Sequence, residues 1–196
     1  MEFMNFDDYQ QASLKFLPKD IAFSPLISKK AMCIMGIIGE SKELLDVLNS
    51  IHIAPIVEFK SNIFNEIGDI LWYSVILMYL YNITPEEAYR MRDDEPSIKD
   101  EIGYDEILKI STDIVMTAAS FCEEMKKVIF HKHDLNGENF MWFFGKIFNY
   151  LDKICQVFEI NWYFIMEVNY NKLFARYGDE GLTEENSQGR IEYKKL

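Results

Sequence analysis

The sequence predicts an all-α protein that forms a single helical domain over residues 1–196. Glycine and proline are sparse, with 9 and 5 occurrences in 196 residues, so few positions favour tight turns. Long segments repeat apolar residues at spacings of three and four, the period of an amphipathic helix, and no segment shows convincing strand alternation. Hydrophobic residues make up 49% of the chain and aromatic residues 15%, which is enough for a packed interior.

The expected long helices follow one another with short connections. They cover Phe6–Leu17, Pro25–Asn49, Phe59–Tyr81, Asp105–Phe130, Phe140–Phe158 and Trp162–Tyr177. Ser24 and Pro25 are typical of a helix start, with serine as N-cap and proline in the first turn. Thr84, Pro85 and Glu87 indicate a further start with a capping box. Loops are expected at 19–24, 52–55, 90–96 and 131–138, and a polar tail at 179–196.

The composition excludes several classes of protein. The formal net charge is −12, and an acidic chain repels polyphosphate, so we expect no nucleic-acid partner. The longest apolar stretch, Ile70–Tyr81, is interrupted by Ser74 and is shorter than the ~20 residues that span a bilayer, so we expect a buried core helix and no membrane partner. The three cysteines form no C-x-x-C pair and the acidic N-terminus lacks a basic n-region, so we expect a cytoplasmic protein without disulfides or a signal peptide.

Two acidic motifs are the strongest functional signal in the chain. Glu40 and Glu43 lie three residues apart, as do Glu66 and Asp69, so each pair shares one helix face. Apolar residues flank both pairs, and carboxylates in such surroundings are destabilised unless a cation compensates them. Two antiparallel helices would bring all four together. Oxygen ligands without His or Cys suit Mg²⁺ or Mn²⁺, whereas a di-iron site requires Glu-x-x-His pairs that these helices lack.

The alternative is that these acids are only a solvated surface. A single E-x-x-E on a helix usually means no more than that. Two such pairs on consecutive apolar helices favour the metal site instead.

Four blocks of sequence, which include the two acidic motifs, together point to a known enzyme family. They read GIIGESKELL at 36–45, NEIGDILWY at 65–73, KKVIFHKHDL at 126–135 and NYNKLFARYG at 169–178. This set resembles the MazG-like nucleotide pyrophosphohydrolases of the all-α NTP pyrophosphatase superfamily, with their E-x-x-E and E-x-x-D motifs, Lys-Lys-His turn and closing N-x-x-K-L-x-x-R-Y. The resemblance reaches from about Phe6 to Tyr177, and only 90–110 matches nothing in the family.

The resemblance implies hydrolysis of a nucleoside triphosphate to a monophosphate and pyrophosphate. The metal ligands that it implies for Mg²⁺, or for Mn²⁺ as the alternative, are Glu40, Glu43, Glu66 and Asp69. Either Glu40 or Glu43 would then deprotonate the water that attacks the α-phosphorus. The substrate contacts that it implies are Trp72, Tyr73, Lys126, Lys127, His131, Asn169, Lys172 and Arg176. A structural role is the alternative for each of them, in the core for the aromatic pair and on the surface for the basic residues.

The order of the motifs indicates an internal duplication. In ordinary family members the Lys-Lys-His turn lies between the two acidic motifs, whereas here it follows the second. Ile34–Leu48 aligns with Val115–Ile129, which divides the chain into halves at 1–96 and 97–178. The positions opposite Glu40, Glu66 and Asp69 are then Phe121, Phe143 and Lys146. The alternative is that any two amphipathic helices share apolar positions.

Two other functions stay open at this point. One is a narrower dUTPase- or dCTPase-like activity of the same superfamily, which the two-half architecture favours. The other is a non-catalytic helical module that binds a nucleotide or a protein. Because members of the family pair four-helix units, both a homodimer and a monomer containing two halves stay open as well.

Overall fold

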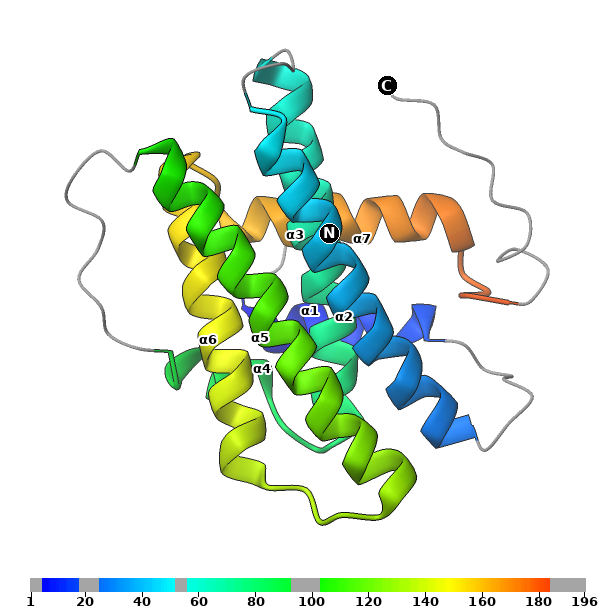
Figure 1. Cartoon of the computed structure of the whole chain (residues 1–196). Coiled ribbons are helices and arrows are strands. Elements are labelled where there is room, and N and C mark those ends of the chain that lie inside the picture. The colour runs from blue at the N-terminus through cyan, green and yellow to red at the C-terminus, as the bar shows by residue number, and fades with distance from the viewer. Residues whose placement is uncertain (1–4, 18–24, 52–55, 93–102, 184–196) are drawn as a thin grey trace.

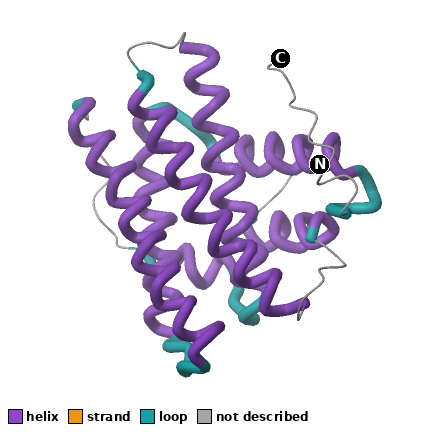
Figure 2. Tube along the Cα trace, turned by 45° about the vertical axis from the view of Figure 1, so that its right-hand side comes forward, coloured by secondary structure: helices purple, strands orange, loops and turns teal. Residues whose placement is uncertain are grey.

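The computed structural model describes residues 5–17, 25–51, 56–92 and 103–183, and this part of the chain is all-α. Its elements are α1 (Phe6–Ser13), the 3₁₀ turn η1 (Leu14–Phe16), α2 (Pro25–Asn49), α3 (Ile56–Tyr79), α4 (Pro85–Arg90), α5 (Tyr104–His131), α6 (Gly137–Val157) and α7 (Trp162–Tyr177). No strand occurs among the described residues (Figure 2), which confirms the predicted fold class. None of the described helices is both long and apolar enough to cross a bilayer.

Four long helices form the body of the protein (Figure 1). α2 packs against both α3 and α5, and α5 packs against α6, so the hairpins α2–α3 and α5–α6 meet through α2 and α5. α7 runs across this body and contacts α3. α1 contacts α3, α4 and α7, while α4 contacts α6, so the short helices connect both hairpins with α7.

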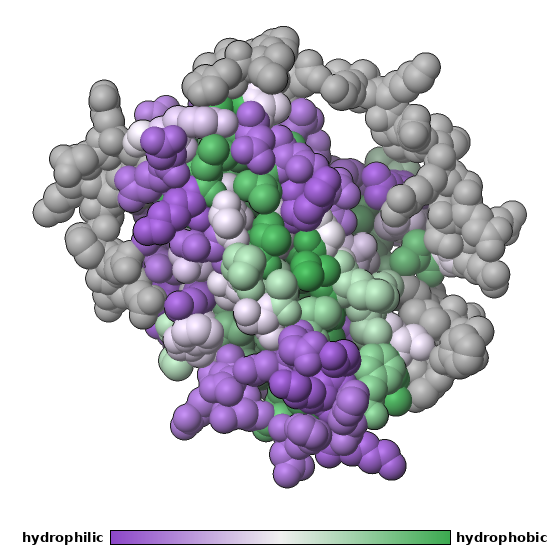
Figure 3. Space-filling model, viewed as in Figure 1, coloured by the Kyte–Doolittle hydropathy of each residue, from purple (hydrophilic) through white to green (hydrophobic). Residues whose placement is uncertain are grey.

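The surface seen in the same view divides by polarity (Figure 3). Hydrophilic side chains gather at the bottom, where the α5–α6 turn lies, and a more hydrophobic band crosses the middle along α2 and α5. Exposed apolar side chains of these two helices include Met35 and Met116. An apolar surface strip thus runs along α2 and α5, which contact each other, while the α5–α6 turn is polar.

The core is densest around α3. Residues 70–78 are all buried except the half-buried Tyr73, so the expected buried helix is confirmed over 70–78, whereas Tyr79 is exposed and α3 ends there. The hydroxyl group of Ser74 donates to the carbonyl oxygen of Ile70 at 2.7 Å, which satisfies this buried polar group within the helix. The core continues into the second hairpin, where the rings of Phe121 and Phe143 stack with centroids 3.7 Å apart.

The first helix is shorter than the sequence predicted. α1 ends at Ser13 rather than Leu17, and the 3₁₀ turn carries the chain on to Phe16. Leu17 is already extended, with φ −69° and ψ 128°. Proline disfavours the α conformation of the residue before it, and Pro18 follows Leu17, so the helix cannot continue to that point.

The loop predicted at 131–138 is also shorter than expected. α5 continues to His131, and Lys132 ends it in the left-handed conformation with φ 59°. The side chain of Asn136 accepts hydrogen bonds from the backbone N–H groups of Glu138 and Asn139, so α6 begins at Gly137 rather than Phe140. Asn-Gly here is a helix cap and not a free turn.

Other predicted boundaries fall within a few residues or lie outside the described residues. The capping box is confirmed, because the Thr84 hydroxyl oxygen accepts from the Glu87 N–H and the Glu87 carboxylate accepts from the Thr84 N–H. α3 covers Ile56–Tyr79 rather than 59–81. The predicted Ser24 cap lies outside the described residues, as do most of the predicted loops and of the tail.

α2 and α3 approach each other closely at Gly36. A Cβ atom added there would lie 2.5 Å from ring atoms of Tyr73, so this ring packs directly on the glycine backbone. The corresponding position at Gly39, on the same helix, has no atom within 4 Å. The contact between α2 and α3 therefore depends on Gly36 and not on Gly39.

Substituting these two glycines tests the contact. Gly36→Ala is expected to lower the free energy of unfolding by about 1–3 kcal/mol, because the added methyl group displaces the Tyr73 ring. Gly39→Ala is the matched control and is expected to raise it by about 0.5–1 kcal/mol, because alanine is the better helix former and meets no neighbour. Urea unfolding followed by circular dichroism measures both changes. Equal stability of the two variants would contradict the close approach.

Candidate metal centre

The structure brings three of the four predicted metal ligands together. Glu40 and Glu43 lie on α2 and Glu66 lies on α3, which is the neighbour of α2. One carboxylate oxygen from each of these three residues lies within 4.8 Å of the others. The spacing of three residues places both glutamates of α2 on the face that meets α3, so the local helix geometry produces the convergence.

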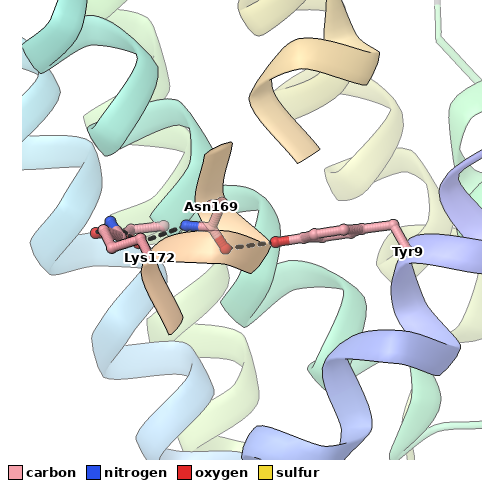
Figure 4. Close-up of polar contacts among 4 residues, drawn as sticks. Tyr9, Asn169 and Lys172 are labelled. Carbon is pink, nitrogen blue, oxygen red and sulfur yellow. Dashed lines mark hydrogen bonds and ion pairs between the residues drawn. The ribbon is translucent and has the colours of Figure 1, made fainter. Parts of the chain in front are cut away.

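Asp69, the fourth predicted ligand, has other partners. The ammonium group of Lys172 donates to both of its carboxylate oxygens, at 2.5 and 2.6 Å. The amide nitrogen of Asn169 donates to Oδ1 of Asp69 at 2.7 Å. Both partners belong to α7, so the crossing of α7 over α3 determines what Asp69 contacts (Figure 4).

Burial and mutual repulsion perturb the acids of this cluster. Burial raises the pKa of Glu40 to about 8, and the charges of Asp69, Glu43 and Glu66 add to the effect. Burial likewise raises the pKa of Glu66 to about 7, with Asp69 and Glu43 adding to it. The positive charge of Lys172 opposes both shifts. Without a further cation, protons therefore compensate part of this cluster near neutral pH.

The donor set fits a hard divalent cation. The three converging side chains are all carboxylates, and among the described residues no Cys or His joins the group. Mg²⁺ and Mn²⁺ favour oxygen ligands and are commonly bound by a few carboxylates together with water and substrate phosphates. A divalent cation would also stabilise the ionised carboxylates that burial disfavours. Glu40, Glu43 and Glu66 are therefore the residues that would hold it, with Asp69 beside them.

The two aromatic residues predicted to border a substrate occupy different environments. Trp72 is buried, at 4% exposure, and its indole N–H has no hydrogen-bond partner among the described residues. Tyr73 is half-buried on Gly36, and the charges of Glu40 and Asp69 add to the effect of burial in raising its pKa. The structure thus places Tyr73 next to the acids and Trp72 in the core.

Of the basic residues predicted to bind phosphate, Lys172 alone contacts an acid of the cluster within the described parts of the chain. Arg176, one turn further along α7, is exposed, with its guanidinium carbon 5.9 Å from the ring centroid of Tyr177. Lys126 and Lys127 pair with Glu123 on their own helix, at 2.5 and 4.0 Å.

The Lys-Lys-His turn belongs to another part of the molecule. His131 is exposed at the end of α5, which lies at the bottom of Figure 1, away from the crossing of α7 and α3. Lys127 and His133 line a separate pocket of about 220 Å³ between the end of α5 and the start of α6. No contact in the described chain joins this turn to the acidic cluster.

Two residues of the site have roles that sequence reasoning missed. Asn169, expected to bind substrate, is 1% exposed, and both ends of its amide are used, because the hydroxyl group of Tyr9 donates to its Oδ1 at 2.6 Å. Tyr9 itself was not predicted, since it is one apolar position of a short amphipathic helix. The two residues are 160 positions apart, so no spacing in the sequence relates them.

Comparison with protein-family models, with curated proteins and with solved structures finds no match to this chain. The chemistry of the site is therefore inferred from its own residues. These are converging glutamates on two helices, an aspartate beside them, and an ammonium group supplied by a third helix.

The raised pKa values predict how stability depends on pH. The folded protein holds protons on Glu40 up to about pH 8 and on Glu66 up to about pH 7, whereas both titrate near 4.5 in the unfolded chain. Between these values the folded state binds more protons, so the free energy of unfolding contributed by these groups falls as the pH rises from about 4.5 to about 8.

Thermal unfolding in a chelator, from pH 5 to 8, measures this decline. Glu40→Gln should flatten it, because the amide does not titrate. Saturating Mg²⁺ should raise Tm most at the upper end of the range, because the cation favours the ionised carboxylates. A Tm of the chelated protein that rises over this range in the wild type but not in Glu40→Gln would contradict the proton-compensated cluster.

Proposed function

We propose that this protein is a divalent-metal-dependent nucleoside triphosphate pyrophosphohydrolase, which releases a nucleoside monophosphate and pyrophosphate. The observation that carries the proposal is the convergence of Glu40, Glu43 and Glu66 from two helices, with oxygens within 4.8 Å of one another. The sequence blocks that surround these acids, and that resemble the MazG-like enzymes, supply the reaction. The fold is proposed to be of the all-α NTP pyrophosphatase type.

The charge of the protein supports a role for a metal ion. The chain has a formal net charge of −12, and an acidic cluster repels a triphosphate. When bound, Mg²⁺ or Mn²⁺ supplies the positive charge that phosphate oxygens require and lowers the pKa of a bound water. Glu40, Glu43 and Glu66 would hold the cation, and either Glu40 or Glu43 would accept the proton of the attacking water.

Residues next to the cluster have the chemistry for binding the substrate. Lys172 places an ammonium group at Asp69, where a triphosphate bound through the cation would arrive, and ammonium groups bind phosphate oxygens. Tyr73 presents a half-buried ring close to the acids, a surface on which a base or sugar packs. Arg176 is exposed one helical turn beyond Lys172 and adds positive charge on the same helix.

The two-half architecture is also a proposal, and one geometric observation supports it. Phe121 and Phe143, which the alignment places opposite Glu40 and Glu66, contact each other in the second hairpin as the two acids do in the first. The rings stack with an interplanar angle of 6°. Equivalent positions thus face each other in both hairpins, with aromatic rings in one and carboxylates in the other. This pairing favours the dUTPase- or dCTPase-like enzyme as the second candidate function.

A nucleotide panel tests the proposed reaction. Pyrophosphate release from ribo- and deoxyribonucleoside triphosphates is expected with Mg²⁺ or Mn²⁺ and not with a chelator. Glu43→Gln and Asp69→Asn are each expected to lower kcat by at least about a hundredfold, because the first removes a charge from the converging carboxylates and the second removes one directly beside them. Release confined to dUTP or dCTP would select the second candidate.

The control is Glu124→Gln, at the position that the alignment places opposite Glu43. Glu124 is exposed on α5 and should be dispensable for turnover. Absence of metal-dependent release from every nucleotide would overturn the enzymatic proposal and leave a helical module with a binding role. Equal losses for Glu124→Gln and Glu43→Gln would show that the acidic cluster is not the site.

A further inference from the structure

Asp69 is held by two contacts of different kind (Figure 4). One is a chain of hydrogen bonds from Tyr9 through Asn169 to Oδ1 of the carboxylate. The other is the ammonium group of Lys172, which contacts both carboxylate oxygens. Both arrive from outside the hairpin that carries the acids, so they are additions to the metal cluster itself.

The first contact is rigid. Tyr9 is 0% exposed and Asn169 is 1% exposed, so neither side chain has room to move. A Cβ atom added at Gly68 would lie 2.9 Å from both Cβ and Nδ2 of Asn169, so α3 and α7 approach closely beside the amide. The phenol of Tyr9 donates to Oδ1 of Asn169, and Nδ2 of Asn169 donates to the carboxylate of Asp69. This chain fixes the orientation of Asp69.

The second contact is accessible to solvent. The side chains of Lys172 and Asp69 are 21% and 22% exposed, so solvent reaches the ion pair. Lysine is a flexible point charge that moves without disturbing its helix, unlike a packed amide. Its charge also acts beyond Asp69, since it lowers the pKa of both Glu40 and Glu66. In the described chain it is the one ammonium or guanidinium group in contact with the cluster.

We propose that Lys172 is an internal counter-cation, which neutralises Asp69 while the cluster holds no metal ion and leaves it when a divalent cation binds, whereas Tyr9 and Asn169 keep Asp69 in place. The inference rests on the metal site proposed above. An ammonium group and a divalent cation on one carboxylate repel each other, so the two compete for Asp69. Once displaced, the ammonium group of Lys172 would be free to contact an anionic substrate at the site. Tyr9 and Asn169 are positioning residues, which act on the cation only through Asp69.

Binding of Mn²⁺ to the full chain without nucleotide tests this competition, measured by loss of the free-ion electron paramagnetic resonance signal. Lys172→Met should bind Mn²⁺ more tightly, on the order of tenfold, because the competing positive charge is gone. Lys172→Gln, which also removes the ammonium charge, should likewise bind Mn²⁺ more tightly. It serves as the second variant in case Lys172→Met folds poorly. Tyr9→Phe should bind it more weakly, by roughly three- to tenfold, because Asn169 loses the donor that fixes it. Lys172→Met and Tyr9→Phe should both lower the Tm of the metal-free protein. Because their effects on Mn²⁺ affinity are expected to be opposite, the two variants separate competition from a purely structural role.

A second readout follows the Lys172 ammonium group in the wild-type protein. In wild-type protein with ¹⁵N-labelled lysine, the Lys172 ammonium resonance, assigned by its loss in Lys172→Gln, should shift when Mg²⁺ is added.

For the Mn²⁺-binding measurement, Lys42→Met is the matched control, because Lys42 lies beside Glu43 but pairs with the exposed Asp46. It should change the Mn²⁺ affinity by less than about twofold, since solvent screens an exposed charge.

The outcomes separate this inference from the proposed function. Wild-type protein that binds Mn²⁺, together with a Glu43→Gln variant that does not, supports the metal site. In that case, equal or weaker binding by Lys172→Met and Lys172→Gln, or an ammonium resonance that Mg²⁺ leaves unmoved, would overturn the competition alone. Absence of Mn²⁺ binding by the wild type would overturn the metal site and the inference together. A gain for Lys42→Met equal to that for Lys172→Met would reduce the effect to net charge and overturn it too.

Discussion

Repulsion among four carboxylates on two neighbouring helices is the constraint on which the rest of this site depends. Partial burial of Glu40 and Glu66 reduces the screening of their charges by water, so protons or cations stabilise this part of the cluster. The fold supplies one cation, the ammonium group of Lys172, which lies on Asp69. α7 is therefore more than a packing element, because its crossing over α3 determines the charge balance of the cluster.

Under the proposed two-half architecture, the second hairpin carries apolar side chains at the positions that correspond to the acids. Phe121 and Phe143 stack in the core, and their contact is favourable through burial alone. Glu40 and Glu66 approach each other between α2 and α3, where the proximity of two carboxylates is unfavourable while both are ionised. One hairpin thus contributes mainly stability, while the other carries a destabilised group of side chains, as is common for functional sites.

Residues on other helices orient the carboxylate of Asp69. Tyr9 on α1 and Asn169 on α7 form a buried chain of hydrogen bonds that ends on Asp69. Such supporting contacts hold a ligand group in position before the cation or substrate arrives, which lowers the reorganisation needed on binding. The Lys-Lys-His turn takes no part in this arrangement, because its lysines pair with Glu123 at the far end of α5.

Local features of this protein were determined by the sequence by itself. The helical period, the capping box at Thr84 and the face shared by each acidic pair depend only on residues a few positions apart, and the structure agrees with each. The start of α6 differed because Asn136 serves as a cap where Asn-Gly also suits a turn. Only the tertiary structure decided that Lys172 forms an ion pair with Asp69 and that Asn169 is buried against Tyr9. Helical spacing determines which side chains share a face, but the partners opposite that face come from remote segments and depend on how the helices pack.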